Sequence, residues 1–412
     1  MSDTVPFNIS IPAIILAEPD LGPVDPTGPC HPPELKGGVM KKGGVMKNWP
    51  LGWFFALVCL VSPSSAYAGY SNVFIFGDSL SDSGNNAVVL APSVTPVPIS
   101  GNSFIPTFPY ASGHYTNGPV WAQTFASGLG LSVNPSLAPG GTDYAFGGAR
   151  TGPLTPNPFP GGLFDPFPPS LETQAAFFLF QHANVAPSSA LYVVAGGGNN
   201  ARDALIAIAG CTTVACVNAI IQSTAGAFAR DIGAIDAELE LAGAKKIVVW
   251  DVPDIGDAPA VRAAGAAALG TLVAASMNAA LQAAIASDLD VQLFDLFGLV
   301  DHIVTDPGAF GLTNVTDACA QFTLCDPSKY LFWDGIHPTS AGHLIIGDAM
   351  LAQVPEAATL MLLGAGAAGL AAFAWRRHRS QSARPTSSRS PMAGYLPPWW
   401  RRNTQNSCAA SR

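Results

Sequence analysis

Two short segments carry the residues that are best suited to do chemistry. Ser79 lies three residues after the apolar run 73–76. Asp334 precedes His337 by three residues near the far end of the region 69–352. A serine hydroxyl is a poor nucleophile until a base takes its proton, and an imidazole base needs a carboxylate to hold its tautomer. We therefore predict that Ser79 is a nucleophile, His337 its general base and Asp334 the group that orients the imidazole.

Each of these segments also has an alternative interpretation. Ser81 stands where the Gly-x-Ser-x-Gly elbow has its second glycine, so an Asp/Ser-rich turn is the alternative for the first segment taken alone. His343 is a second candidate base, but it falls within the expected helix 340–351. Asp78 and Asp82 are interpreted as supports of the nucleophile turn, because Asp334 is better placed to orient the histidine.

The elements that must position these residues alternate between strand-like and helix-like patterns. Uninterrupted apolar runs suit strands that are buried on both faces of a parallel sheet, and they occur at 73–76, 191–194, 247–250 and 291–294. Alanine-rich helical stretches lie at 214–241 and 259–287. The alternation predicts one doubly wound α/β domain over 69–352, with ligands bound beyond the carboxyl ends of the strands. We expect a helix directly after Ser79, with its N-terminal N–H groups beside the hydroxyl.

The composition excludes one large class of partner. The 412-residue chain is 49% apolar and 11% charged, which allows a sizeable core. Its formal net charge is −9, but residues 69–355 carry 7 Lys/Arg against 22 Asp/Glu, which gives −15 for this region. The strongly negative charge of this region argues against nucleic acid as a partner, because nucleic-acid binding needs a basic surface.

The first 68 residues are predicted to contain an export signal, and the segment in front of that signal is not expected to be translated. Residues 46–68 combine Lys47, the apolar stretch 51–61 and a small-residue cleavage pattern, Ala-Tyr-Ala, which predicts a secretory signal peptide cut by signal peptidase. Residues 1–45 do not belong in front of such a signal. We infer that translation starts at Met46 or Met40, and a genuine disordered extension is the alternative.

Four of the seven cysteines fall within the predicted domain as two close pairs. An even number of cysteines in local pairs suits short-loop disulfides in an oxidising compartment, here Cys211–Cys216 and Cys319–Cys325. A zinc site is the alternative, but neither pair has Cys-x-x-Cys spacing. We therefore expect two disulfides and no metal ligands.

A second sorting pattern follows the domain. Val-Pro-Glu at 354–356 precedes the uncharged stretch 357–375, which is long enough to span a bilayer, and an arginine cluster follows at 376–379. This arrangement resembles the PEP-CTERM sorting signal of Gram-negative bacteria, although Ala357 stands where that family has its second proline. The resemblance implies a sorting signal with a transmembrane helix over 353–379, an exosortase-like partner, and an exported protein in the cell envelope or outside the cell. At least transient anchoring by this helix is expected, and 380–412 is expected to be a disordered tail.

The Gly-x-Gly-x-x-Gly pattern at 364–369 matches a dinucleotide-binding fingerprint, but it follows no strand and lies inside the apolar span. We interpret it as small-residue helix packing, not as a nucleotide site.

Four segments of the domain, in order and spacing, resemble the successive blocks of the GDSL, or SGNH, hydrolase family: 73–86, 143–151, 197–200 and 332–343. The resemblance covers essentially 73–351. It implies a three-layer α/β/α sandwich of flavodoxin-like type with a parallel sheet of about five strands, and acyl transfer to water through an acyl-enzyme without metal or organic cofactor. Block matching puts the oxyanion-hole donors at the N–H groups of Ser79 and Gly148 and the side-chain amide of Asn199.

Two positions depart from the family pattern. Asp143 replaces the usual asparagine, and Asn200 replaces the aspartate that commonly follows the block's asparagine. The blocks most resemble the lecithinase/haemolysin-like and outer-membrane esterase branch, which implies an exported esterase or lipase acting on lipid or fatty-acyl esters. A carbohydrate acetylesterase acting on extracellular polysaccharide, and a non-catalytic surface protein on the same fold, are the alternatives.

Overall fold

The computed structural model describes residues 69–91, 93–99, 110–111, 113–153 and 167–354. The chain separates into two compact units, Met1–Thr359 and Leu360–Arg412, and every described residue belongs to the first. The segments predicted as a start extension, a signal peptide and a C-terminal tail therefore lie outside the described residues, as does all but the beginning of the predicted sorting signal.

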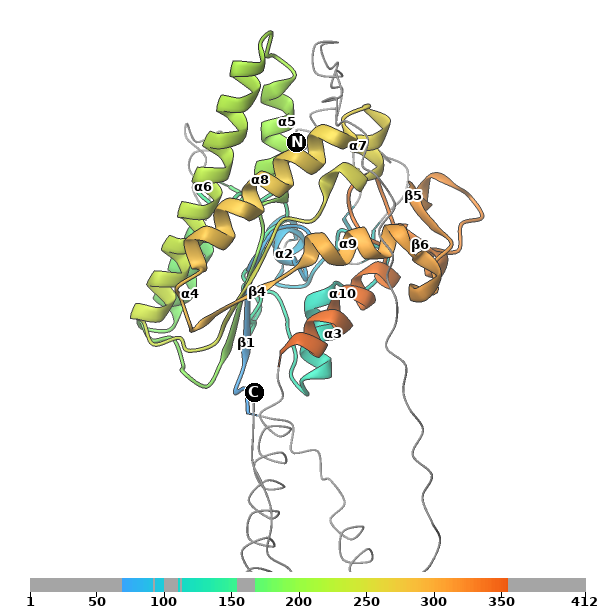
Figure 1. Ribbon diagram of the computed structural model, residues 1–412. Helices are drawn as coiled ribbons and strands as arrows, with labels where there is room; N and C mark the ends of the chain where they lie inside the picture. The colour runs from blue at the N-terminus through green and yellow to red at the C-terminus, as the bar shows by residue number, and fades with distance from the viewer. Residues whose placement is uncertain (1–68, 92, 100–109, 112, 154–166, 355–412) are drawn as a thin grey trace, which may run out of the picture. The chain divides into compact units, whose positions relative to one another are not determined.

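Four parallel strands form the central sheet of the domain (Figure 1). Their order in the sheet is their order in the chain, and each corresponds to one of the predicted apolar runs: β1 (Val73–Gly77), β2 (Leu191–Ala195), β3 (Ile247–Trp250) and β4 (Val291–Phe294). Because all four run the same way, their carboxyl ends share one edge, where ligand sites of open α/β sheets form.

A fifth segment lies along the free edge of β1. Asp143 forms an isolated parallel bridge with Ile75, and the Tyr144 N–H donates to the Ile75 carbonyl at 2.7 Å. The Phe146 N–H donates to the Gly77 carbonyl at 3.1 Å. The sheet expected to have about five strands thus has four regular strands within the described residues, with 142–146 in the place of a fifth. This pairing brings the residues after Phe146 to the carboxyl end of β1.

The strand side chains alternate between two cores. One face, which includes Phe74 and Phe76, packs against the helices α4 (Leu171–Gln181), α5 (Gly198–Ile208), α6 (Val214–Leu241) and α8 (Ala267–Ile285). The other face, which includes Val73 and Ile75, packs against α3 (Trp121–Gly128), α9 (Leu296–Thr305) and α10 (Ser340–Gln353). The domain is therefore an α/β/α sandwich of three layers, as the sequence predicts.

The helix predicted over 259–287 is divided in two. Its first part is α7 (Pro259–Ala263) and its second is α8, because Gly265 takes a left-handed conformation (φ +69°) that a continuous helix cannot accommodate. Among the described residues, α8 alone is long and apolar enough to cross a membrane. Its Val273 and Met277 are fully buried in the core beside α6, as in the core helix of a folded domain.

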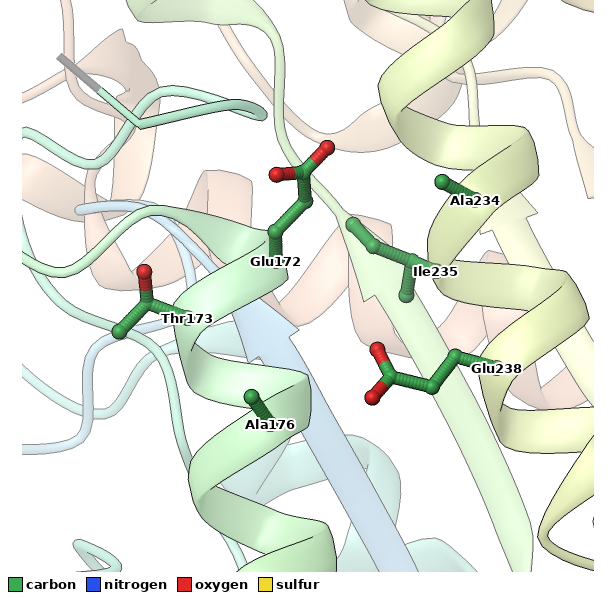
Figure 2. Close-up of a pocket in the computed structure, with 6 residues that line it drawn as sticks. All are labelled: Glu172, Thr173, Ala176, Ala234, Ile235 and Glu238. Carbon is green, nitrogen blue, oxygen red and sulfur yellow. The ribbon is translucent and has the colours of Figure 1, made fainter. Parts of the chain in front are cut away.

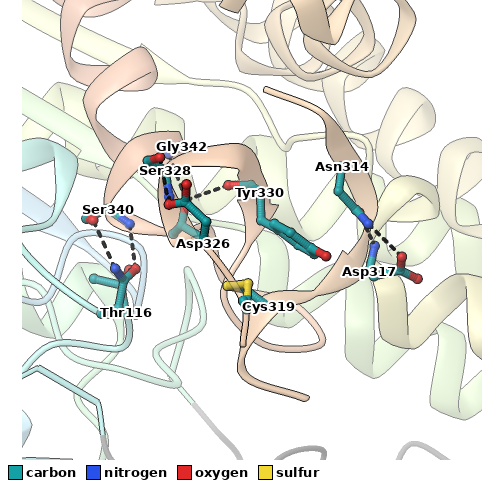
Figure 3. Close-up of a disulfide and its surroundings, with 12 residues drawn as sticks. Thr116, Asn314, Asp317, Cys319, Asp326, Ser328, Tyr330, Ser340 and Gly342 are labelled. Atoms are coloured by element: carbon teal, nitrogen blue, oxygen red, sulfur yellow. Dashed lines mark hydrogen bonds between the residues drawn. A yellow bond between two sulfur atoms is a disulfide. The ribbon is translucent and has the colours of Figure 1, made fainter. Parts of the chain in front are cut away.

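Two disulfides close short loops in the pairing expected from the sequence. Cys211, just after α5, bonds to Cys216 in the first turn of α6, with a Cα–Cα distance of 5.6 Å. Cys319 bonds to Cys325 between the strands β5 (Asn314–Ala318) and β6 (Tyr330–Phe332), which pair in a small parallel sheet (Figure 3). The second disulfide thus steadies the connection that leads into β6 and the turn after it.

One buried carboxyl group in α6 has no hydrogen-bond partner within the described structure. Both side-chain oxygens of Asp236 are buried without a hydrogen bond to any described residue. Burial raises its pKa to about 8, and the charges of Asp288 and Glu240 act in the same direction. The group is therefore favoured as a neutral acid inside the fold, and it titrates more easily in the unfolded chain.

This burial predicts a pH-dependent loss of stability. Because the pKa of Asp236 is raised in the folded state, its stabilising contribution is complete below the unfolded pKa and is lost as pH rises through about 8. Asp236→Asn removes this titration. The free energy of unfolding of the variant, relative to that of wild type, should therefore be about 2–3 kcal/mol higher at pH 9 than at pH 6. Urea unfolding at both pH values measures this gain. Asp348→Asn, on the exposed side of α10, is the control, and an equal gain in both variants would contradict the assignment.

Candidate active site

Ser79, His337 and Asp334 form a continuous hydrogen-bonded series at the carboxyl end of the sheet. The Ser79 Oγ lies 2.8 Å from His337 Nε2, and His337 Nδ1 lies 2.7 Å from Asp334 Oδ2. Ser79 and His337 are 258 positions apart in the chain. β1 ends two residues before the serine, and the turn after β6 carries the histidine. An imidazole protonated at Nδ1 satisfies both contacts and leaves Nε2 free to accept the serine proton.

Asp334 is held as an ion by its surroundings. Its side chain is fully buried, and its Oδ1 accepts the backbone N–H groups of Ile336 and His337 at 2.8 and 2.7 Å. The hydroxyl of Tyr110 donates to Oδ2 at 2.9 Å. Burial alone would raise its pKa, but the charge of His337 and the hydrogen bonds hold the pKa of Asp334 below its usual value. An ionised carboxylate at this position stabilises the imidazolium that forms when His337 takes a proton.

His343, the alternative base, has a structural role at the start of α3. Its Nδ1 accepts the backbone N–H of Trp121 at 3.2 Å, which satisfies one donor at the start of α3. The ring is fully buried, and desolvation, with the charges of His337 and His114, lowers its pKa to about 3. His343 is therefore a neutral packing residue, whereas His337 is the histidine in contact with Ser79.

The turn that presents Ser79 is organised by Asp78. Its carbonyl accepts the N–H groups of Ser81 and Asp82, each at 3.0 Å, and its Oδ1 accepts the Leu80 N–H at 3.0 Å. The helix predicted directly after Ser79 is not there. The chain first makes this side-chain-stabilised turn, and α2 (Asn85–Leu90) begins six residues after the serine.

Asp82 joins this turn to two other segments. Its Oδ1 accepts the N–H groups of Gly84 and Asn85 at 2.8 and 2.6 Å, which satisfies donors at the start of α2. Its Oδ2 accepts the Gly147 N–H at 2.9 Å. The side chain is fully buried, and burial raises its pKa to about 6. The support role predicted for Asp82 thus consists of fixing the loop around Gly147 against the nucleophile turn.

Asp143 has a structural reason to depart from the asparagine of the family pattern. Its Oδ2 accepts the Ser83 N–H at 2.7 Å, and its Oδ1 accepts the Ala145 N–H at 3.0 Å. Two backbone donors are thus met by two different oxygens. An asparagine has a single side-chain oxygen and would set its NH₂ group against one of these donors. Burial and the charge of Asp82 raise the pKa of Asp143 well above its usual value.

Two of the three predicted oxyanion donors lie on the wall of one pocket. Ser79 and Asn199 line the pocket, and one N–H of the Asn199 amide donates to the Ala149 carbonyl at 2.9 Å, which leaves the other available. Gly148 is not a wall residue. It takes a left-handed conformation (φ +86°) one position before Ala149. Neither the Ser79 N–H nor the Gly148 N–H has an acceptor within the described part of the chain.

Asn200, the neighbour of Asn199, is committed elsewhere. Its Oδ1 accepts the Thr151 N–H at 3.1 Å, and its Nδ2 donates to the Thr151 hydroxyl at 3.1 Å. The two asparagines therefore have separate surroundings, one at the pocket and one at the loop after Arg150.

The pocket beside Ser79 has a volume of about 80 Å³ and a mainly apolar wall. Apolar side chains come from the nucleophile turn, from the segment between β3 and α8, and from the turn before His337: Leu80, Ile255, Ala258, Val261 and Ile336. Two residues with charged side chains, Asp78 of the nucleophile turn and Arg202 of α5, also line it. Neither Arg202 nor Tyr110, the partner of Asp334, was predicted as a site residue, because each lies in a segment whose sequence carries no catalytic motif.

A second hollow lies between α4 and α6 (Figure 2). Its most polar side chains are Glu172 and Glu238, and burial raises the pKa of Glu172. The residues that line this hollow include no histidine or serine, so it offers no activated nucleophile of the kind found at Ser79.

Within the described residues, one group of carboxylates is close enough to share a cation. Oxygen atoms of Asp254, Asp257 and Asp301 lie within 4.8 Å of one another. Two of these acids already have partners in the fold, since the Thr271 hydroxyl donates to Asp254 and Arg262 pairs with Asp257 at 2.9 Å.

Comparison with known families covers most of the described domain. Residues 73–350 match the family of GDSL-like lipases and acylhydrolases, and residues 353–379 match the PEP-CTERM protein-sorting motif. The first match includes every residue of the Ser79–His337–Asp334 series. The second begins at the last residue of α10.

Three curated relatives illustrate the similarity. A GDSL esterase/lipase of Arabidopsis thaliana is 26% identical over 349 residues, which cover 73% of this chain and 95% of the relative. Esterase EstA of Pseudomonas aeruginosa is 27% identical, and the matched region covers 70% of this chain and 47% of EstA. A Pseudomonas putida protein from the trpE–trpG intergenic region is 27% identical, and the matched region covers 74% of this chain and 52% of that protein. The chain thus spans about half the length of these two bacterial relatives.

Among solved structures, the carbohydrate acetylesterase Est24 of Sinorhizobium meliloti is 14% identical with a TM-score of 0.37, over 68% of this chain and 97% of that protein. So distant a likeness carries no information on the substrate.

The geometry predicts that Ser79→Ala abolishes hydrolysis without unfolding the domain. Only the Oγ in contact with His337 is lost, and loss of a serine nucleophile typically lowers kcat by about 10⁶-fold. Turnover of a p-nitrophenyl ester and circular dichroism measure the two effects, with Ser223→Ala, exposed on α6, as the control. A serine-directed phosphonate should modify wild type at Ser79, and modification of another serine would refute the assignment.

The contrast between the two asparagines predicts the oxyanion donor. An amide that donates to the tetrahedral intermediate strengthens its bond as charge develops, so Asn199→Ala should lower kcat by about 10²–10³-fold with little change in KM. Asn200→Ala should lower kcat by about tenfold or less, since it loses only neutral bonds to Thr151. Both variants are measured on one soluble ester. A larger loss in Asn200→Ala would show that Asn200 is the donor.

Proposed function

This chain belongs to the GDSL-like lipase/acylhydrolase family, and from that membership and its site we propose that it is an exported hydrolase that cleaves carboxylic esters through an acyl-enzyme on Ser79. The observation that carries the proposal is the hydrogen-bonded series from the Ser79 Oγ through His337 to Asp334. A non-catalytic protein on this fold would have no need of a buried ionised carboxylate behind a histidine that touches a serine.

The proposed reaction has two halves. In the first, the Ser79 Oγ attacks the ester carbonyl while its proton passes to His337 Nε2, and a tetrahedral oxyanion forms. The oxyanion then collapses, the carbon–oxygen bond to the alcohol breaks, and His337 returns the proton to the departing alcohol. In the second half, water attacks the acyl-enzyme, gives a proton to His337 and releases the acid, and the same proton regenerates the Ser79 hydroxyl.

The charge on the tetrahedral oxyanion needs donors that are free before the substrate arrives. The N–H groups of Ser79 and Gly148 and the second N–H of the Asn199 amide meet this condition in the described structure. The bond from Asn199 to Ala149 and the bond from Gly147 to Asp82 keep the donors in place, which limits the reorganisation needed at the moment of reaction.

Export is part of the proposal. The PEP-CTERM motif at 353–379 indicates export and sorting to the cell envelope, and it implies an exosortase-type sorting enzyme as a partner. Two disulfides within the domain suit an oxidising compartment. We place the signal peptide at 46–68, so that the mature domain begins at Gly69 and remains anchored at least transiently through the C-terminal span.

The pocket wall favours fatty-acyl esters over acetylated carbohydrate. Leu80, Ile255, Val261 and Ile336 provide apolar surface next to Ser79. This part of the wall suits methylene groups better than sugar hydroxyls, because its side chains form no hydrogen bonds. An acyl chain that extends along this surface gains free energy with each methylene that leaves water. A fatty-acyl or lipid ester is therefore the proposed substrate class.

This class predicts a preference that grows with acyl length. Each buried methylene contributes about 0.8 kcal/mol, so kcat/KM should rise about tenfold from p-nitrophenyl acetate to the butyrate and stay high for the octanoate. Steady-state rates for the three esters measure this, with Ser79→Ala as the background. Preference for acetate would favour the carbohydrate acetylesterase instead, and no Ser79-dependent hydrolysis of any ester would favour a non-catalytic protein.

A further inference from the structure

Arg202 differs from the other cationic side chains of the domain. The described residues include seven Lys/Arg. Four of them form ion pairs with aspartates: Arg150, Arg230, Lys245 and Arg262. Lys329 donates to a backbone carbonyl, and Lys246 is exposed. Arg202 is the seventh. It is half-buried, and it has no hydrogen bond or ion pair in the described part of the chain.

Arg202 lines the same pocket as Ser79 and His337, the proposed reacting groups. It lies three residues after Asn199 on α5, so the two side chains share one face of the helix, and both line the pocket that holds Ser79 and His337. Gly198, at the start of the same helix, also lines the pocket. The partial positive charge of a helix N-terminus and a guanidinium therefore act on the same small volume.

The nearby acids do not satisfy the guanidinium. Asp203 is taken by Arg150, which donates to both of its oxygens at 2.8 and 2.9 Å. Asp78, on the pocket wall, uses Oδ1 to accept the Leu80 N–H and forms no ion pair with Arg202. Burial and the charge of Arg150 lower the pKa of Arg202, although the charges of Asp203 and Asp78 act in the opposite direction.

A partly desolvated guanidinium without a partner is unfavourable unless a ligand supplies the missing acceptors. Carboxylate and phosphate groups match its planar array of N–H donors.

We propose that Arg202 binds a carboxylate or phosphate group of the substrate, so that the preferred ester carries a negative charge close to its scissile bond. This rests on the proposed ester hydrolysis at Ser79 and specifies its substrate further. The domain as a whole is strongly acidic and repels anions at long range, so the preference comes from the short-range contact with Arg202.

Matched pairs of esters test this with the purified full-length chain. The first pair is p-nitrophenyl butyrate and p-nitrophenyl hemisuccinate, which have acyl groups of equal length and differ by a terminal carboxylate. The second is monobutyrin and 1-butyrylglycerol 3-phosphate, which differ by a phosphate on the alcohol. The variants are Arg202→Gln, which removes the charge, Arg202→Lys, which keeps the charge and loses the planar donors, and Arg230→Gln as the control on the exposed side of α6.

The readout is the ratio of kcat/KM for the anionic ester to kcat/KM for its neutral partner. Wild type should favour the anionic ester in at least one pair, and the pair identifies which side of the ester carries the charge. Arg202→Gln should lower that ratio by about tenfold or more, mainly through KM, and Arg202→Lys should restore part of it. Arg230→Gln should leave the ratio unchanged.

Two results would overturn the proposal. An equal loss on both members of each pair, with a shifted pH profile, would show that Arg202 acts through Asp78 instead of through the substrate. A wild-type ratio below one in both pairs would show that the pocket rejects anions. Failure to hydrolyse any ester would contradict the proposed function itself, and this inference with it.

Discussion

Four backbone N–H groups converge on the carboxylate of Asp82, and the arrangement of the active site depends on this convergence. The donors come from Gly84, Asn85 and Asn86 at the start of α2 and from Gly147 on the loop beside β1. One buried side chain thereby fixes the turn that carries Ser79, the helix that follows it and the loop that carries Gly148. A carboxylate is suited to this because its two oxygens accept several bonds, and burial makes each bond stronger than it would be in water.

A second set of contacts completes the support around this carboxylate. Asn85 donates from Nδ2 to the carbonyls of Asp143 and Ala145, and Asp143 in turn accepts from Ser83. The ring of Tyr115 packs so closely over Gly147 that a side chain at 147 would overlap it, and the same ring lies 5.4 Å from the His337 ring. The two ends of the hydrolytic site are thus held by one polar network. Because the members of such a buried network hold one another in place, a substitution at one of them should alter the geometry of several segments.

The features that the sequence predicted are those with a local signal. Uninterrupted apolar runs marked the four strands, alanine-rich composition marked α6 to the residue, and motif spacing singled out the serine and the Asp-x-x-His turn. The structure placed these last groups in contact, while their catalytic roles remain proposals. The features that the sequence missed depend on contacts across the fold. Tyr110 reaches Asp334 over 224 positions. Arg202 stands out because it is partly buried and unpaired while most other cations of the described domain form ion pairs, which no pattern within its own helix reveals. The delayed start of α2 has the same cause, since the side chain of Asp82 sets it.

The 258-position separation of Ser79 and His337 has a consequence for how the protein acquires activity. A chain folded only as far as β4 contains Ser79 without its contact to His337, because the turn after β6 and the packing of α10 against α3 are still missing. Contacts between such distant positions form late, since they depend on closing long loops. Until those contacts form, the Ser79 hydroxyl has no imidazole beside it to take its proton and is a poor nucleophile. On the proposed mechanism, hydrolysis therefore begins only when the last elements of the domain have folded.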